Sequence, residues 1–194
     1  MNQKINLLIK KGSSVPVMAH DGEDACYDLI TVDEPVILGQ SIDRPLDGGK
    51  LWKSIDSIQY RTNLYCTPES QTFSFKGENY SPDIINHFYI HIFPRSSIYK
   101  YNLLLANSVP TIDRGYRGEI ILNYKYCYQP EDMVILQEGG INKIYFTVNE
   151  DKVFHTNDKI AQFNIYGTNY VNFVVVDDLG KSYRNSKGFG SSGN

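Results

Sequence analysis

The pattern that most constrains this chain is an alternation of apolar and polar residues with a period of two. It is clearest over residues 58–64, Ile-Gln-Tyr-Arg-Thr-Asn-Leu, and it recurs in the stretches 5–10, 87–92 and 161–165. Because successive side chains of a β-strand point to opposite faces, each stretch predicts a strand with one buried face and one wet face. Residues 171–176 are more continuously apolar and predict a strand buried on both faces.

Turn-forming residues separate these strands, as in Asp21-Gly22, Asp47-Gly48-Gly49 and Glu138-Gly139-Gly140. Many short strands with such turns predict an all-β fold, a distorted jelly-roll β-sandwich or barrel. The sequence contains no long amphipathic helix pattern, and at most a short turn or helix follows Ser96-Ser97. We expect a single domain over residues 1–194, in which 39–86 and 129–156 are β-hairpin insertions. The first of these stretches predicts a strand pair at roughly 57–66 and 72–76.

Composition excludes several classes of protein. A formal net charge of −3 argues against a general binder of nucleic acids or membrane surfaces. No apolar run approaches the ~20 residues that a membrane span needs. Three widely spaced cysteines favour free thiols in a reducing compartment. We therefore expect a cytoplasmic or nuclear protein, or one in the host-cell cytoplasm if it is viral, with no nucleic-acid or membrane partner.

The last eleven residues, 184–194, allow two interpretations. They contain three glycines, three serines, two cations and a single aromatic residue, Phe189, between two glycines. Such a composition is typical of a disordered terminus. The same residues could instead form a lid that stacks on a ring and holds phosphates, because glycine lets the backbone approach an anion closely.

A second segment, residues 93–120, has a composition suited to chemistry on anions. Between residues 95 and 117 it contains four cations and one acid, Asp113, which precedes a Gly115 turn. A solitary carboxylate among cations and hydroxyl groups fits a general base that stays ionised near bound anions. Asp113 could equally be a residue that only opens a turn.

Five motifs in order resemble those of the trimeric dUTP pyrophosphatases (dUTPases). They are Ala25–Leu29, Pro94–Ser97, Asn107 with Thr111–Gly118, Asn157–Phe163, and Arg184–Gly193. The resemblance covers the chain from its first strand to its end, apart from the two insertions, and is greatest to enlarged protozoan or large-virus members. The sequence departs from the family pattern at Cys26 and Pro110, which replace glycines, and at Gly115, which replaces an acidic residue.

The resemblance implies a jelly-roll subunit with a flexible C-terminal arm, in a homotrimer whose active sites lie at subunit interfaces. The family hydrolyses dUTP to dUMP and pyrophosphate with Mg²⁺ bound across the triphosphate, which keeps uracil out of DNA and supplies dUMP. By position, Asp113 would activate the attacking water, Tyr116 would exclude a 2′-hydroxyl, and Asp28 would support the metal through water. The substrate-binding residues would be Arg95, Ser96, Ser97, Asn107, Ile112, Tyr116, Gln162, Arg184, Phe189, Gly190, Ser191 and Ser192. Among these, Asn107 and its hairpin would read uracil, Phe189 would stack on it, and the serines, Gln162 and Arg184 would hold phosphates.

Two other functions stay open on the sequence alone. The related dCTP deaminases share the fold, but they need a glutamate where this chain has Asn123, and asparagine cannot shuttle a proton. A non-catalytic interaction module is the other alternative, with the insertions as partner surfaces. Asp113, Tyr116 and Phe189 are all present, which favours an active enzyme.

Overall fold

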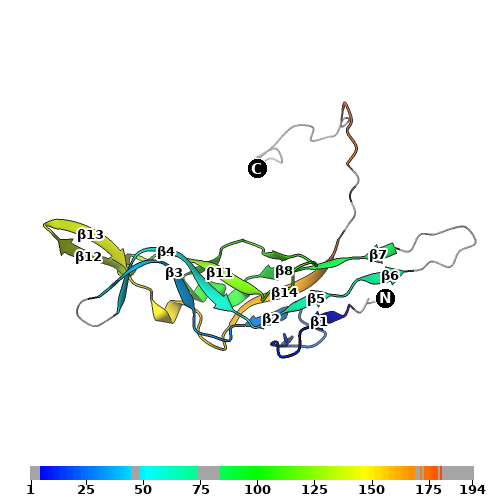
Figure 1. Ribbon diagram of the computed structural model, residues 1–194, viewed down its shortest axis with the longest axis horizontal. Helices are drawn as coiled ribbons and strands as arrows, with labels where there is room; N and C mark the ends of the chain where they lie inside the picture. Colours follow the sequence, from blue (N-terminus) through cyan, green and yellow to red (C-terminus); the bar gives the residue numbers. More distant parts are fainter. Residues whose placement is uncertain are drawn as a thin grey trace, which may run out of the picture.

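The structure is a computed structural model that describes residues 5–44, 49–73, 84–168, 171, 173–178 and 180. In this part of the chain the regular secondary structure is almost entirely β (Figure 1). The strands are β1 Leu7–Ile9, β2 Tyr27–Ile30, β3 Val36–Asp43, β4 Lys50–Arg61, β5 Cys66–Pro68, β6 Gln71–Phe73, β7 Ile84–Asn86, β8 Phe88–Phe93, β9 Leu103–Leu105, β10 Thr111–Ile112, β11 Ile121–Tyr126, β12 Met133–Glu138, β13 Ile141–Phe146 and β14 Lys159–Gly167. Three short 3-10 segments are η1 Ser96–Lys100, η2 Pro130–Asp132 and η3 Glu150–Lys152. The short turn or helix that the sequence allows after Ser96-Ser97 corresponds to η1, which already begins at Ser96.

Two main sheets form the sandwich. The four-stranded sheet has the order β10-β8-β14-β2, and the larger sheet has the order β12-β13-β4-β11-β9, with β3 also paired to β4. The smaller pairs β1-β5 and β6-β7 complete the described strands. The sheets are open at their edges. The prediction of an all-β jelly-roll fold is confirmed by this arrangement.

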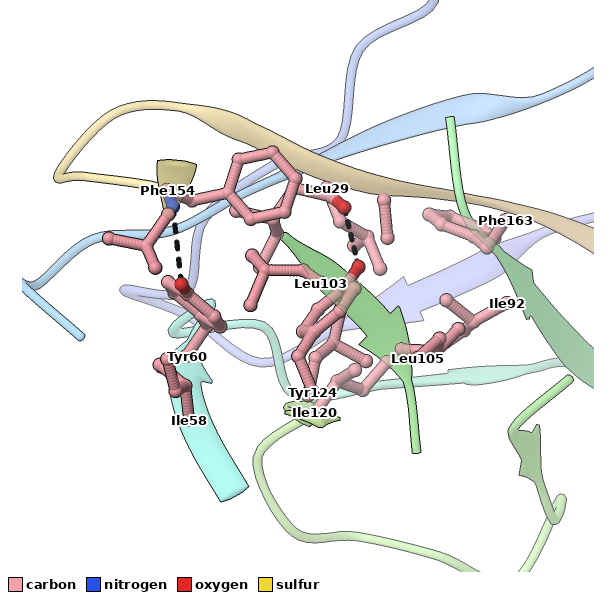
Figure 2. Close-up of a cluster of buried hydrophobic side chains, with 14 of the residues drawn as sticks. Leu29, Ile58, Tyr60, Ile92, Leu103, Leu105, Ile120, Tyr124, Phe154 and Phe163 are labelled. Carbon is pink, nitrogen blue, oxygen red and sulfur yellow. Dashed lines mark hydrogen bonds between the residues drawn. The ribbon is translucent and has the colours of Figure 1, made fainter. Parts of the chain in front are cut away.

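The core lies between the two main sheets and is rich in aromatic residues (Figure 2). Tyr60 of β4 and Tyr124 of β11 meet edge to face with Phe154, at ring-centroid distances of 5.6 to 5.7 Å. Both hydroxyl groups form hydrogen bonds. The Tyr60 hydroxyl accepts one from the Phe154 backbone N–H at 3.2 Å, and the Tyr124 hydroxyl donates one to the Ile160 carbonyl at 2.6 Å. The second bond ties the larger sheet to the start of β14, and burial raises the pKa of both tyrosines.

The strand β4 has a different extent and a different partner from the sequence prediction. It spans twelve residues and pairs with β3, β11 and β13. The described part of the expected partner at 72–76, residues 72 and 73, belongs to β6, which pairs with β7. The β3–β4 ladder shifts register at two bulges, Leu38/Gly39 and Gln40/Ser41, opposite the part of β4 that precedes the alternating stretch 58–64, which the prediction used. A Cβ at Gly39 would collide with the Ser54 carbonyl, so the first bulge requires a glycine.

The two predicted insertions differ in their relation to the core. Ile58 and Tyr60, both within 39–86, are fully buried at the centre of the larger sheet, so this stretch contributes to the core. Within 129–156, the β12–β13 hairpin projects from one end of the molecule (Figure 1). It joins β4 through the pair Phe146–Trp52. Whether either stretch is an insertion relative to compact relatives stays a prediction, as does the single-domain boundary 1–194.

The prediction of a doubly buried strand at 171–176 is wrong. The described residues there form no strand, and the five apolar side chains are 54 to 98% exposed. The physical reason is that a continuous apolar run does not by itself show that a segment is covered, and no described element of this chain covers residues 171–176.

Candidate functional site

The end of β10 presents Asp113, the predicted general base. Thr111 and Ile112 pair with His91 and Ile90 of β8, and Asp113 follows directly as an exposed residue. The Tyr116 backbone N–H donates to the Asp113 carbonyl at 2.9 Å, which closes a tight turn. Asp113 therefore does open a turn, and its position at a strand end, predicted from the sequence, is confirmed. A cavity of about 520 Å³ adjoins it, lined also by Tyr89, Thr111 and Thr168.

Tyr116 lies on the other side of the same turn. A smaller cavity of about 190 Å³ is lined by Ile112, Asp113 and Tyr116 together. The Tyr116 ring is 43% exposed, and its hydroxyl donates to the Glu119 backbone carbonyl at 2.8 Å. The ring is thus held by its hydroxyl group while the residue stays partly exposed to solvent. Three of the predicted site residues therefore meet at one cavity, whereas Asn107 lies exposed in the turn that precedes β10.

A second cluster lies where β2, β8 and β14 are side by side. Gln162 of β14 pairs with Asp28 of β2 on one side and with Phe93 of β8 on the other. Arg95 follows β8, and its Nε lies 2.8 Å from Asp28 Oδ1. Gln162 donates weakly to the Pro94 carbonyl at 3.4 Å. This register brings together residues of three of the five motifs.

The cluster also contains a residue that the sequence reasoning missed. Lys159 Nζ lies 2.8 Å from Asp28 Oδ2, so the Asp28 carboxylate, only 6% exposed, has a cation on each oxygen. Two cations on one carboxylate leave a net positive charge at this end of the sheet, which suits an anion. Ser96 and Ser97 follow Arg95 directly and begin η1. Lys159 stands in the fourth motif, so the sequence contains a signal for it. Its contact with Asp28 depends on the register of β14 against β2 and could not be predicted from the spacing of residues.

The sequence predicts a metal site in which Asp28 supports Mg²⁺ only through a water molecule. The described residues hold no group of three or more His, Cys, Asp or Glu side chains placed to bind a metal ion. Both Asp28 oxygens already contact cations, so its direct coordination of Mg²⁺ does not fit this arrangement. Contact through a water molecule does fit, because Mg²⁺ keeps several waters and takes its other ligands from phosphates.

The two clusters lie toward opposite ends of β8. Ile112 pairs with Ile90, and Gln162 pairs with Phe93, three residues farther along the strand. Asp113 lies beyond the Ile112–Ile90 pair, toward the start of β8. Arg95 lies beyond Phe93, past the other end of the strand. At roughly 3.3 Å per residue, the strand positions level with Asp113 and Arg95 are about 20 Å apart. One chain therefore does not bring the predicted base and the predicted phosphate ligands to one point.

A buried carboxylate that the sequence reasoning also missed supports the Tyr116 turn. Glu119 is 8% exposed and accepts hydrogen bonds from Arg61 Nε and Nη2 at 3.1 and 3.0 Å and from the Asn63 backbone N–H at 2.8 Å. Burial by itself raises the pKa of Glu119, but the hydrogen bonds and the Arg61 charge outweigh it and lower the pKa below its usual value. Glu119 is therefore held as an anion at the base of the turn.

Some predicted residues cannot be placed. Arg184, Phe189, Gly190, Ser191 and Ser192 lie outside the described residues. Asn123, where a deaminase would need a glutamate, accepts a hydrogen bond from the Gln59 side chain at 3.2 Å. The three cysteines are free thiols, as predicted. In the described part of the chain, no helix has the length and apolarity needed to cross a membrane.

Comparisons with known proteins point to one family. No family profile matches the chain. It is 35% identical to the deoxyuridine 5′-triphosphate nucleotidohydrolase of Helicobacter hepaticus over 118 residues, 60% of this chain and 62% of that protein. It is 28% identical to the same enzyme of Clostridium acetobutylicum over 193 residues, 97% of each chain. The chain thus spans about three-fifths of the first relative and nearly all of the second.

Solved structures give the same result for the fold. The dUTPase of Staphylococcus bacteriophage 80alpha with dUPNHPP has a TM-score of 0.58 at 21% identity, covering 97% of this chain and 99% of that chain. A mutant dUTPase from phage phi11 of S. aureus, whose description mentions a structural Mg(II) ion, has a TM-score of 0.52 at 16% identity, covering 91% and 99%. The order of the motifs, the relatives and the jelly-roll fold agree, and the chain is similar to the dUTPases in each of them.

Proposed function

We propose that this protein hydrolyses dUTP to dUMP and pyrophosphate. The observation that carries the proposal is the pair Asp113 and Tyr116 at one cavity, on the turn that follows β10. A carboxylate beside an accessible aromatic ring can orient a water molecule toward phosphorus while the ring packs against a sugar. Relatives that carry the name dUTP nucleotidohydrolase support the same substrate.

In the proposed reaction, Asp113 takes a proton from the water that attacks the α-phosphorus in line, and pyrophosphate leaves. Tyr116 packs against C2′ of the deoxyribose, where a 2′-hydroxyl would collide. Ser96, Ser97 and Gln162 donate hydrogen bonds to phosphate oxygens, and Arg95 and Lys159 supply positive charge. Such positioning and charge neutralisation account for most of the catalysis of phosphoryl transfer.

Mg²⁺ would be held chiefly by the triphosphate, with Asp28 contacting a metal-bound water. The ion would neutralise the charge that develops on the phosphates. A related phage dUTPase structure is described with a structural Mg(II) ion, which supports metal binding in the family. The remaining proposed ligands, Arg184, Phe189, Gly190, Ser191 and Ser192, would close over uracil and the outer phosphates as a lid.

We further propose that the active site is shared between copies of the chain in a homotrimer. Asp113 and the Arg95–Gln162 cluster diverge toward opposite ends of β8, so a complete site needs a second chain. The exposed apolar side chains of 171–176 support the same assembly, because water contact with that much apolar surface is unfavourable unless a neighbour covers it.

Two variants together test the role of Asp113 as the base and the sharing of the active site between chains. Asp113→Asn should lower kcat for dUTP by roughly 10²-fold or more while nucleotide affinity is retained. Gln162→Glu should also be inactive, because it places a negative charge against the phosphates. If the two residues act from different chains, trimers reassembled from an equal mixture should recover about a quarter of the wild-type rate, since random assembly leaves that share of sites intact. No recovery, with exchange of subunits verified by mass, would refute the shared site.

A further inference from the structure

We propose that Gly118 and Glu119 are positioning residues that fix the Tyr116 ring and so set the discrimination between deoxyribo- and ribonucleotides. The proposal rests on the function proposed above, in which Tyr116 packs against the sugar. Gly118 and Glu119 would not contact the substrate themselves. They would hold Tyr116, which would.

Gly118 leaves the space in which the Tyr116 ring lies. A Cβ built at Gly118 would collide with the Tyr116 hydroxyl, and it would lie 2.6 Å from the ring Cζ and 3.0 Å from Cε2. Contacts this short do not occur in folded proteins, so any side chain here displaces the ring. The Gly118 φ is not positive, so its backbone conformation does not call for glycine. The requirement at Gly118 is therefore for space beneath Tyr116.

Glu119 holds the tip of the same ring. Its backbone carbonyl accepts the Tyr116 hydroxyl at 2.8 Å, while its buried carboxylate is held by Arg61 and by the Asn63 backbone. The next residue is anchored as well, because the Ile120 N–H donates to the Leu64 carbonyl at 2.9 Å. The Glu119 carbonyl that accepts the Tyr116 hydroxyl is thus immobilised, because the end of β4 and the residues after it hold both the Glu119 side chain and the next backbone N–H.

A ring held in this way can reject a small group. A ribonucleotide differs from a deoxyribonucleotide by one hydroxyl, and an apolar surface excludes it only if the surface does not yield. A displacement of about 1 Å is enough to change rates by up to ~10²-fold in a positioned site. Moving the Tyr116 ring should therefore change the choice of sugar more than the stability of the fold.

The test compares dUTP with UTP as substrates of the full-length protein. In Gly118→Ala, the ratio of kcat/KM for dUTP to that for UTP should fall about tenfold or more, mainly through a better KM for UTP. Gly115→Ala adds the same methyl group in the same turn, where its Cβ has no neighbour within 4 Å, and should keep the wild-type ratio. An unchanged ratio in Gly118→Ala, with wild-type thermal stability, would overturn the proposal.

Three further variants cover the case in which Gly118→Ala does not fold. Tyr116→Phe adds no atom and removes only the bond to the Glu119 carbonyl, so the ratio should fall several-fold. Glu119→Gln, which keeps the shape of the side chain, should retain more of the ratio than Glu119→Ala. If neither Tyr116→Phe nor Glu119→Ala lowers the ratio, the inference fails. A wild-type protein that releases no pyrophosphate from dUTP would instead refute the proposed function itself.

Discussion

The Asp28 carboxylate between Arg95 and Lys159 gives a prediction whose size follows from its burial. Asp28→Asn leaves two cations facing a neutral amide. Removing one partner of a fully buried ion pair costs about 3–5 kcal/mol. Because the Arg95 and Lys159 side chains are 29 and 39% exposed, water replaces part of the lost interaction, and we expect a loss of about 2 kcal/mol in the free energy of unfolding. For a chain of 194 residues this corresponds to a Tm roughly 5 °C lower.

Calorimetry at one protein concentration measures this shift, and Asp33→Asn is the matched control. Asp33 pairs with Arg61 at 3.3 Å, but both side chains are about half exposed, so its loss should change the free energy of unfolding by less than about 0.5 kcal/mol. If Asp28→Asn is as stable as Asp33→Asn, the claim that this carboxylate joins β2, β8 and β14 is wrong. The same variant should need several-fold more Mg²⁺ for its half-maximal rate if Asp28 supports the hydrated metal.

Three further predictions concern the core, the pH response and the tail. Tyr124→Phe leaves the buried Ile160 carbonyl without its partner and should cost about 1–3 kcal/mol in urea unfolding, whereas an unchanged midpoint would mean that the bond contributes nothing. The Glu34 side chain and the Glu150 carbonyl raise the pKa of His155, so the stabilisation from this His155–Glu34 pair is full below about pH 6.5 and is lost as pH rises through the raised pKa. Glu34→Gln should therefore lower Tm at pH 6 more than at pH 9, and an equal loss at both would contradict this. Ending the chain after Ser182 should leave a folded trimer that barely turns over dUTP, and wild-type turnover would mean that the tail is not a lid.

Local pattern was sufficient to predict two of the strands that line the core. The alternation at 87–92 and 161–165 corresponds to β8 and β14, whose inward residues, such as Ile90 and Phe163, are fully buried. The position of Asp113 at a strand end also followed from local sequence. Each of these predictions depends only on residues within a few positions of one another.

The contacts of the site could not be read in this way, because they depend on register. Asp28, Arg95 and Lys159 meet only because β2, β14 and β8 are neighbours in one sheet. Glu119 and Arg61 are 58 positions apart and meet through the β11–β4 ladder. The error at 171–176 has another cause, since the hydrophobic pattern of a segment does not tell whether the rest of the chain covers it.

The most direct test of the account is a substrate panel. The purified full-length protein is incubated with Mg²⁺ and, separately, with dUTP, dCTP, dTTP and UTP, while pyrophosphate and ammonia are followed as independent products. We predict rapid release of pyrophosphate from dUTP, little from the other three nucleotides, and no ammonia from any of them. Ammonia from dCTP, or the absence of pyrophosphate from dUTP, would contradict the account.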